Sequence, residues 1–196
     1  DVSTNSIAEE LETKASSVTD MIQKLTEKGY VNYKKYNGTS LTKKGYEIAI
    51  NIVRKHRLWE VFLVNKLNFQ WDEVHDLAEQ LEHIKSNKLV EHLDAFLDFP
   101  KYDPHGDPIP SKDGSLPKSF SAPLIELMTG KKGQVVGVSQ DNPAFLQYLD
   151  KLKINLGSII EVIEKVDFDQ SLELKINNTP THISAEVAKN ILIKQK

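Results

Sequence analysis

One short stretch of the chain carries four side chains that can bind a metal ion. Glu79, Glu82 and His83 follow His75 at offsets of 4, 7 and 8 residues, so a helix would hold all four on one face. Two imidazoles and two carboxylates are common ligands of a divalent cation. Solvated amphipathic helices carry the same residue types, so this face alone leaves both interpretations open.

An earlier pair of residues has the same character. His56 and Glu60 stand four residues apart in another segment with helical periodicity. Alone, such a pair is more often solvated surface charge than a metal site. Antiparallel packing of the two consecutive helices would bring the pair and the four-residue face together, however, and this favours metal binding.

The absence of cysteine limits the chemistry of such a site. Histidine nitrogen and carboxylate oxygen must supply the ligands, which suits Mn, Fe, Co and Zn. A metal-dependent hydrolase would use the same donors with an open coordination position and a general base. The sequence has no His-Glu-x-x-His element, Gly-rich phosphate loop or nucleophile elbow, so we expect no enzyme.

The N-terminal region predicts a domain that binds DNA. Two helices are expected, the first capped by Ser3 or Thr4 and the second by Ser16 or Ser17. The hairpin signal Asn37-Gly38 then separates two short alternating runs, which indicates a two-stranded wing. Helix, short turn, helix and wing together describe a winged helix-turn-helix.

The candidate DNA contacts lie at the start of the second helix and in the wing. Short polar side chains at a helix N-terminus can reach base edges or phosphates, and nearby lysines can contact phosphate. Residues 1–58 carry a net charge of +3, whereas the whole chain carries −3, so a basic face is available locally. These candidates are Lys14, Ser16, Ser17, Thr19, Asp20, Lys34 and Lys35.

The remaining segments predict a helical region, a linker and a small β domain. Thr42 caps a long helix, and two further helices are expected at about 72–84 and after Ser86, with apolar faces wide enough for a partner subunit. Five of the eight prolines lie within 100–117, which predicts a linker with little regular structure. Alternating runs at 134–138, 159–166 and 172–176, a helix at about 143–152 and a last helix capped by Ser184 complete the chain.

Global features place further limits on function. The 196 residues are enough for two small domains, with 39% hydrophobic and 27% charged residues. No apolar run is long enough for a transmembrane helix, and no signal peptide opens the chain. We therefore expect a cytoplasmic protein with no membrane partner.

Taken in order, these elements resemble the diphtheria toxin repressor and manganese transport regulator family of metal-dependent transcriptional repressors. Three stretches carry the resemblance: Val-Arg-Lys-His-Arg-Leu-Trp-Glu at 53–60, the segment 74–83, and Gly-Asp-Pro-Ile-Pro at 106–110. The resemblance implies a mainly α fold with a small β domain. Its parts would be a winged helix-turn-helix at 1–48, a helical metal-binding and dimerisation domain at 49–99, a Pro-rich linker at 100–122 and an SH3-like domain at 123–196.

The resemblance also implies two metal sites. His56, Glu60 and His75 match an ancillary site, and Glu79, Glu82 and His83 match a primary, activating site. Iron-responsive members usually have Cys where this chain has Glu79, so its carboxylate favours Mn(II) over Fe(II). In the C-terminal domain Asp141 lies near an acidic ligand position, whereas Ala144 replaces a second donor, a Gln. A helix that precedes Asp1 in family members would supply a further primary-site ligand.

The function implied by this resemblance is a repressor that binds a double-stranded DNA operator as a homodimer when Mn(II) or Fe(II) is bound. Its targets would be genes of metal ion homeostasis. The alternatives are a metal-independent winged-helix regulator, whose His and Glu faces are solvated, and the metal-dependent hydrolase considered above. Operator binding with and without metal separates the metal-activated repressor from the metal-independent regulator.

Overall fold

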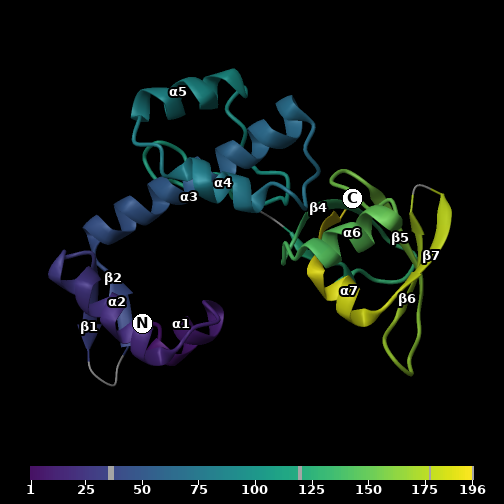
Figure 1. Ribbon diagram of the computed structural model, residues 1–196. Helices are drawn as coiled ribbons and strands as arrows, with labels where there is room; N and C mark the ends of the chain where they lie inside the picture. Colours follow the sequence, from purple (N-terminus) through teal and green to yellow (C-terminus); the bar gives the residue numbers. More distant parts are fainter. Residues whose placement is uncertain (35–37, 119–120, 177, 196) are drawn as a thin grey trace. The chain divides into compact units, whose positions relative to one another are not determined.

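The computed structural model describes residues 1–34, 38–118, 121–176 and 178–195. It divides into two compact units, Asp1–Val53 and Arg54–Lys196, and the long helix α3 (Lys43–Leu67) contributes to both. The fold class expected from the sequence is confirmed, with helices in both units and a β-sheet domain at the C-terminal end (Figure 1).

The first unit is a winged helix-turn-helix. Helices α1 (Thr4–Glu10) and α2 (Ala15–Glu27) precede the antiparallel pair β1 (Val31–Lys34) and β2 (Gly38–Leu41). Ala8, Val18, Ile22 and Val31 form its core. Thr42 caps α3 as expected, because its Oγ1 accepts the N–H of Gly45 at 3.0 Å. Asn37 of the expected turn lies outside the described residues.

The expected cap of α2 is wrong, whereas that of α1 is confirmed. Ser3 Oγ accepts the N–H of Ser6 at 3.0 Å, as an N-cap does. Helix α2 instead begins at Ala15, its N-cap residue is Lys14, and no side chain caps it. Ser16 and Ser17 therefore already lie within its first turn, where their own backbone is helical.

The helical part of the second unit contains the end of α3, then α4 (His75–Glu82) and α5 (Asn87–Phe96). Leu58, Trp59, Val61, Ala78, Val90, Leu93, Leu97 and Ile109 form its core. Helix α4 is shorter than expected because residues 71–74 form turns and bends. Ser86 caps α5 as expected, with Oγ accepting the N–H of Leu89 at 3.3 Å.

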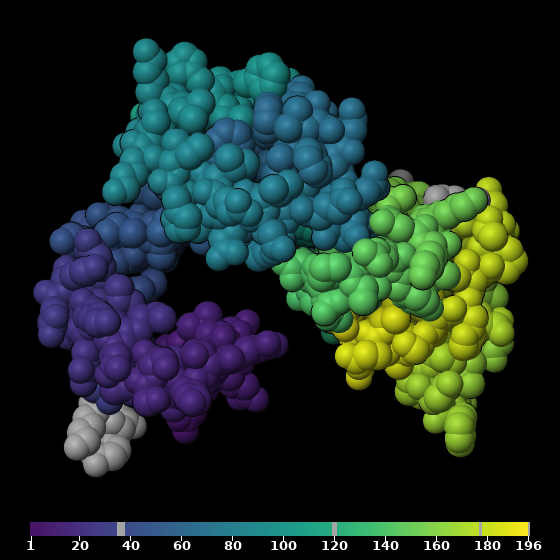
Figure 2. Space-filling model, in the orientation of Figure 1, coloured from purple at the N-terminus to yellow at the C-terminus, as the bar shows by residue number. Residues whose placement is uncertain are grey.

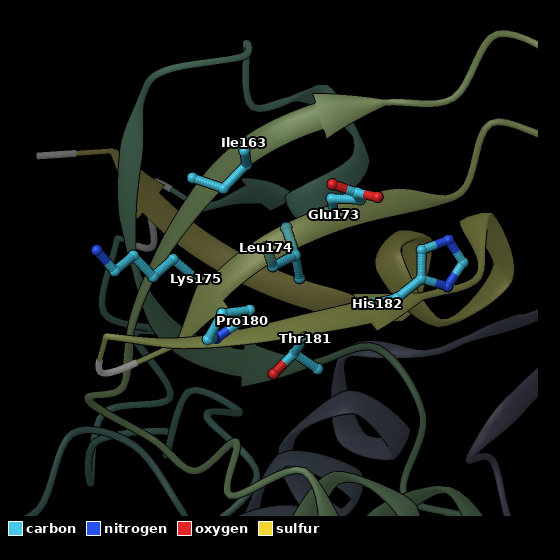
Figure 3. Close-up of a pocket in the computed structure, with 7 residues that line it drawn as sticks. All are labelled: Ile163, Glu173, Leu174, Lys175, Pro180, Thr181 and His182. Atoms are coloured by element: carbon cyan, nitrogen blue, oxygen red, sulfur yellow. The ribbon is translucent and has the colours of Figure 1, made fainter.

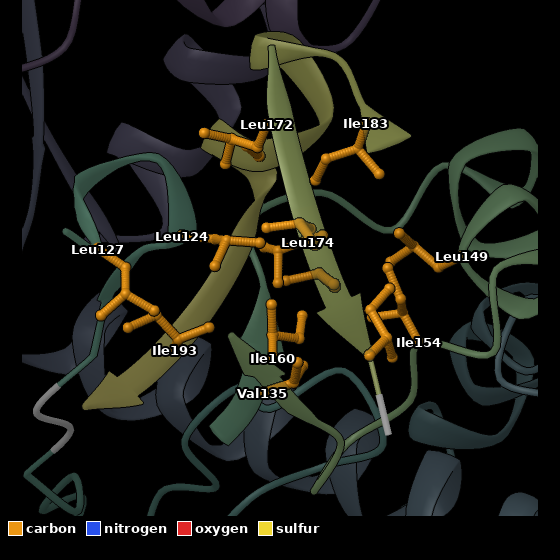
Figure 4. Packing of buried hydrophobic residues seen from close by; sticks show 14 of the residues in the cluster. Leu124, Leu127, Val135, Leu149, Ile154, Ile160, Leu172, Leu174, Ile183 and Ile193 are labelled. Atoms are coloured by element: carbon orange, nitrogen blue, oxygen red, sulfur yellow. The ribbon is translucent and has the colours of Figure 1, made fainter. Parts of the chain in front are cut away.

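The C-terminal part is a six-stranded antiparallel sheet in the order β3-β8-β4-β5-β6-β7. Its strands are β3 (Ala122–Pro123), β4 (Lys132–Val138), β5 (Ile159–Lys165), β6 (Leu172–Ile176), β7 (Thr179–Ile183) and β8 (Ile191–Gln195). The short helix η1 (Leu124–Glu126), α6 (Pro143–Lys151) and α7 (Ala185–Asn190) complete this part. Its core gathers leucine, isoleucine and valine side chains from the sheet, η1 and the end of α6 (Figure 4).

Trp71 and Asp72, just after α3, connect the helical part to the β domain within this second unit. Trp71, which follows α3, is buried in the β-domain core, and its Nε1 donates to Asp150 Oδ2 at 3.1 Å. Gln147 Nε2 donates to Asp72 Oδ2 at 2.8 Å. The space-filling view shows the blue surface that follows α3 against the green surface of the β domain (Figure 2). The two parts therefore meet next to the start of α4.

The Pro-rich segment has little regular structure, as expected, but part of it is buried against the rest of the second unit. Asp103, His105, Ile109 and Pro110 are buried. Gly106 has a φ of +90°, and a Cβ there would lie 2.1 Å from the carbonyl oxygen of Val136. The segment therefore passes so close to β4 that only glycine fits at this position.

Candidate metal centre

A buried carboxylate, that of Glu60, lies at the middle of a group of histidines. Its side chain is 3% exposed. One oxygen, Oε1, lies 3.1 Å from His56 Nε2, 3.8 Å from His75 Nδ1 and 3.8 Å from His105 Nδ1. Among the described residues, every cationic partner recorded for this carboxylate is a histidine, and no Lys or Arg neutralises it. A buried carboxylate needs a counter-charge, and a metal ion would supply one.

The elements that converge here explain this geometry. His56 and Glu60 stand one turn apart on α3, and His75 is the first residue of α4, which packs against α3. The rings of His56 and His75 meet edge to face with centroids 4.9 Å apart. The predicted meeting of these three residues on consecutive helices thus agrees with the structure.

The β domain adds a carboxylate at the edge of this group. Asp141 lies in the loop between β4 and α6, and its Oδ2 is 3.5 Å from His75 Nδ1. Ala144, which stands where the family resemblance placed a second donor, offers no side-chain ligand. Its N–H instead bonds to Asn142 Oδ1 at 2.9 Å, as part of the α6 cap.

Sequence reasoning missed two residues of the cluster, Asp103 and His105. Nδ1 of His105 lies 4.0 Å from Asp103 Oδ1, and these two residues form a second possible metal-binding group with Glu60. The Asp-x-His spacing just before the Gly-Asp-Pro-Ile-Pro stretch was a usable signal. The five prolines of this segment favour a linker over a ligand-bearing loop, which masks this signal. We call Glu60, His56, His75, His105, Asp103 and Asp141 the Glu60 centre.

The tautomer of His105 suits metal binding. Its Nε2 lies 2.8 Å from the backbone carbonyl oxygen of Trp71, which can only accept a hydrogen bond, so Nε2 carries the proton. The ring also stacks on the Trp71 indole at 6.2 Å. In neutral His105 the Nδ1 lone pair therefore faces Glu60. Metal-binding histidines commonly donate their other ring N–H to a carbonyl in this way.

The titratable groups of the centre shift one another's pKa values. Burial alone would raise the pKa of Glu60, but its interactions with His105 and His56 outweigh burial and lower that pKa to about 2. Burial alone would lower the pKa of His105, whereas Glu60 and Asp103 raise it to about 9. Burial and the nearby charge of Glu60 raise the pKa of Asp103 to about 7. In the metal-free protein, protons on these side chains therefore offset the repulsion between the Glu60 and Asp103 carboxylates.

The donor set fits a divalent metal ion. Imidazole nitrogen and carboxylate oxygen are the ligands available, and they suit Mn, Fe, Co or Zn. The two groups of possible ligands, His56 with Glu60 and His75, and Glu60 with Asp103 and His105, share the same carboxylate. They therefore describe one centre built from α3, α4 and the 103–107 loop, with Asp141 at its edge.

The other predicted set of ligands is not assembled. Glu79 and His83 are exposed, and His83 lies just beyond the end of α4. Glu82 Oε2 instead contacts His56 Nδ1 at 2.8 Å, which links α4 to the Glu60 centre. Within the described chain, Glu79, Glu82 and His83 do not form a compact group of ligand atoms.

The predicted DNA contacts lie on the first unit. Lys14 is the N-cap residue of α2, and Ser16, Ser17 and Asp20 are exposed in the first turns of that helix. Thr19 bonds to its own helix, with Oγ1 donating to the Ala15 carbonyl at 2.9 Å. Lys34 is exposed at the end of β1, whereas Lys35 lies outside the described residues.

A hollow of about 520 Å³ lies elsewhere, on the face of strands β5, β6 and β7 (Figure 3). Ile163, Glu173, Leu174, Lys175, Pro180, Thr181 and His182 line it. Its lining shares no residue with the Glu60 centre. His182 Nε2 lies 3.1 Å from Ser171 Oγ, whose O–H donates to Asp169, so this histidine is part of a turn network. The hollow offers no grouped metal ligands.

Comparison with known proteins assigns the parts of the chain. Residues 1–39 match the model of the iron dependent repressor N-terminal DNA binding domain. Residues 42–111 match the iron dependent repressor metal binding and dimerisation domain, and residues 122–195 match the FeoA domain. No helix among the described residues is long and apolar enough to span a membrane.

Individual relatives agree with these matches. A solved structure described as a manganese-dependent transcriptional repressor in complex with manganese is 37% identical, has a TM-score of 0.88, and aligns over 100% of this chain and 91% of its own. The iron-dependent repressor IdeR of Mycobacterium leprae is 33% identical over 66% of this chain and 60% of its own length. A probable metal transport system membrane protein of Chlamydia trachomatis is 43% identical over 45% of this chain, which spans only 19% of that relative.

Proposed function

Because this chain belongs to the diphtheria toxin repressor family of metal-dependent transcriptional repressors, we propose that it binds operator DNA as a homodimer when a divalent ion occupies the Glu60 centre. The observation that carries the proposal is the convergence of three histidine nitrogens on one buried carboxylate. A second supporting feature is that α3, which bears His56 and Glu60, begins directly after the wing.

The proposed regulation follows from linkage between metal and conformation. An ion held by α3, α4 and the 103–107 loop favours whichever arrangement of these elements binds it best. If that arrangement is also the one that binds DNA, metal raises DNA affinity, and DNA raises metal affinity by the same factor. The Glu60 centre would supply the metal ligands, and α2 with the wing would supply the DNA contacts.

We infer that Mn(II) is favoured over Fe(II) as the activating ion. No thiolate is available in this chain, and carboxylates make the site a harder ligand set. The solved relative at 37% identity is described as bound to manganese, which supports the same choice. Competition dialysis under anaerobic conditions tests this point, and preferential retention of Fe(II) would contradict it.

The proposed homodimer rests on an exposed apolar stripe of α5. Leu89 and Phe96 are seven residues apart and therefore lie on one face, and Phe96 is 59% exposed. This helix lies within the segment matched by the dimerisation model. Sedimentation of a Phe96→Ser variant should show a weaker dimer than the wild type, whereas an unchanged dimer would exclude this face.

The decisive experiment is DNA binding with and without metal. Duplexes selected from a random-sequence pool in Mn(II) would be titrated by fluorescence anisotropy in Mn(II) and in chelator. We expect at least about a tenfold loss of affinity in chelator, which is within the usual range of allosteric coupling. Equal affinity in both conditions would instead identify a metal-independent winged-helix regulator.

Residues of α4 and its C-cap form a second candidate set, because Glu79, Glu82 and His83 match the activating ligands implied by the resemblance. Glu82 also touches His56, so its replacement would disturb the Glu60 centre. The double variant Glu79→Ala with His83→Ala is therefore the cleaner test. If activation requires metal at both sets, this variant loses metal-activated DNA binding while Mn(II) still binds the Glu60 centre, whereas full activation in this variant would exclude the second set.

A further inference from the structure

Arg57 holds the loop that carries His105. Its Nη2 donates to Asp107 Oδ2 at 3.0 Å, and its Nη1 donates to the carbonyl oxygen of Pro108 at 2.5 Å. Its Nε lies 3.5 Å from Asp103 Oδ2. One planar guanidinium therefore contacts three points of the segment 103–108, and a lysine could not reproduce this geometry.

Asp103, which Arg57 contacts, is hydrogen-bonded to the backbone on either side of Gly106. Asp103 Oδ1 accepts the N–H of His105 at 2.8 Å and the N–H of Asp107 at 3.0 Å. The N–H of Asp103 in turn donates to the Asp107 carbonyl at 3.0 Å. The loop is thus closed on the Asp103 carboxylate, whose other oxygen faces Arg57.

The far side of the loop is fixed as well. Val138 N–H donates to the His105 carbonyl at 2.9 Å, and Gly106 crosses β4 without space for a side chain. The imidazole of His105 is tied to the Trp71 carbonyl. On the side that faces α3, Arg57 joins the loop to the helix through Asp107, Pro108 and Asp103.

We propose that Arg57 is a positioning residue of the Glu60 centre, which fixes where the 103–107 loop presents Asp103 and His105 to Glu60. Arg57 and Glu60 stand three residues apart on α3, so one helix face holds both the loop and the carboxylate. The proposal rests on the metal centre proposed above. A positive charge near a cation opposes binding, so any contribution of Arg57 to metal affinity must come from geometry.

Arg54 provides a matched control on the same helix. It lies one turn before Arg57 and also binds the proline-rich segment, with Nη1 donating to the Pro110 carbonyl at 2.6 Å. Its Nη2 pairs with Asp94 Oδ2 at 2.6 Å, and both side chains are largely buried. These partners lie outside the 103–108 segment. Arg54 therefore stabilises the fold without setting the loop that bears His105.

The test compares Arg57→Lys, Arg57→Gln and Arg54→Gln with the wild type. Mn(II) affinity would be measured by calorimetry, and amide hydrogen exchange of the metal-free proteins would report on the loop. We expect both Arg57 variants to bind Mn(II) about tenfold more weakly, as is typical when a residue that orients a ligand is lost. The amides of His105 and Asp107 should exchange faster in both. Arg54→Gln should lower the melting temperature but keep Mn(II) affinity close to that of the wild type.

Four results would overturn the proposal, and they differ in meaning. Wild-type affinity in Arg57→Lys, or tighter binding in Arg57→Gln, would show that Arg57 acts only through its charge. An equal loss in Arg54→Gln would show that general destabilisation explains the effect. Absence of Mn(II) binding by the wild type would instead contradict the proposed metal centre itself, and this inference with it.

Discussion

The Glu60 centre and the exposed face of α4 contain the same residue types, but the fold buries the first group and leaves the second in solvent. Histidines of the Glu60 centre come from α3, α4 and an irregular loop and converge on a buried oxygen, and Asp141 of the β domain contacts one of them. Glu79 and His83 come from one helix and its end, and they remain in solvent. Side chains on one helix face diverge outward, so a compact site requires several elements.

This difference separates a preassembled site from one that still needs a partner element. Folding already holds the histidine nitrogens near Glu60, so metal binding there requires little rearrangement. The α4 set would have to gain further ligands before it could enclose an ion. We therefore expect the two regions to respond differently to the same kind of substitution.

The largest contrast should come from matched replacements of Glu60 and Glu79. Glu60→Gln keeps the shape but removes the charge that three histidines share, so Mn(II) affinity at this centre should fall by at least about a hundredfold. Glu79→Gln should leave the same affinity unchanged. Calorimetric titration measures both, and equal effects would refute the distinction between the two regions.

A second contrast concerns the loop that bears His105. Gly106→Ala places a Cβ against the Val136 carbonyl oxygen in addition to its left-handed strain, so we expect a loss of roughly 3 kcal/mol or more in unfolding free energy. Gly130 also has a positive φ, of +77°, but a Cβ there would meet nothing within 4 Å. Gly130→Ala should cost only about 1 kcal/mol. Urea denaturation compares the two, and similar losses would show that the close crossing of β4 is unimportant.

The pH dependence should distinguish the buried centre from solvated residues. Because Glu60 and Asp103 raise the pKa of His105 to about 9, this imidazole is protonated at neutral pH in the metal-free protein. The protonated His105 contributes to the free energy of unfolding. This contribution is complete below the pKa of histidine in the unfolded chain, about 6.5, and is lost as pH rises through the pKa in the folded protein, about 9. Mn(II) must displace the proton, so its affinity should rise from pH 7 to 9 by up to about tenfold per unit.

Calorimetry in buffers of different ionisation enthalpy would also detect the released proton. His105→Asn should bind Mn(II) more weakly and with a flatter pH profile. A wild-type affinity that does not change over this range would contradict the coupling of His105 to Glu60.

The smallest expected effect tests the contribution of the β domain. Asp141 is exposed and contacts His75 alone among the centre's histidines, so Asp141→Asn should weaken Mn(II) binding only severalfold. Asp72→Asn is the matched control, because Asp72 lies nearby and bonds to Gln147 of α6 instead. If both variants bind equally well, Asp141 has no direct part in the centre.

Sequence patterns predicted the regular parts of this molecule better than its site. Helical spacing predicted the helices that bear His56, Glu60 and His75, whereas the grouping of these three residues came from the family resemblance. His105 has no such periodicity, since it reaches the centre from a loop held by side-chain and backbone hydrogen bonds. Strand β7 was also missed because it is a short edge strand with a proline and polar residues, which lacks an apolar pattern.

The central claim is that a divalent ion binds at Glu60, and anomalous diffraction from crystals soaked in Mn(II) tests it most directly. We predict a strong peak at the manganese edge within ligand distance, roughly 2.0–2.3 Å, of Glu60 Oε1 and His105 Nδ1. A second peak at Glu79 and His83 would be compatible with this result. A structure with manganese at the α4 face and none at Glu60 would contradict the account.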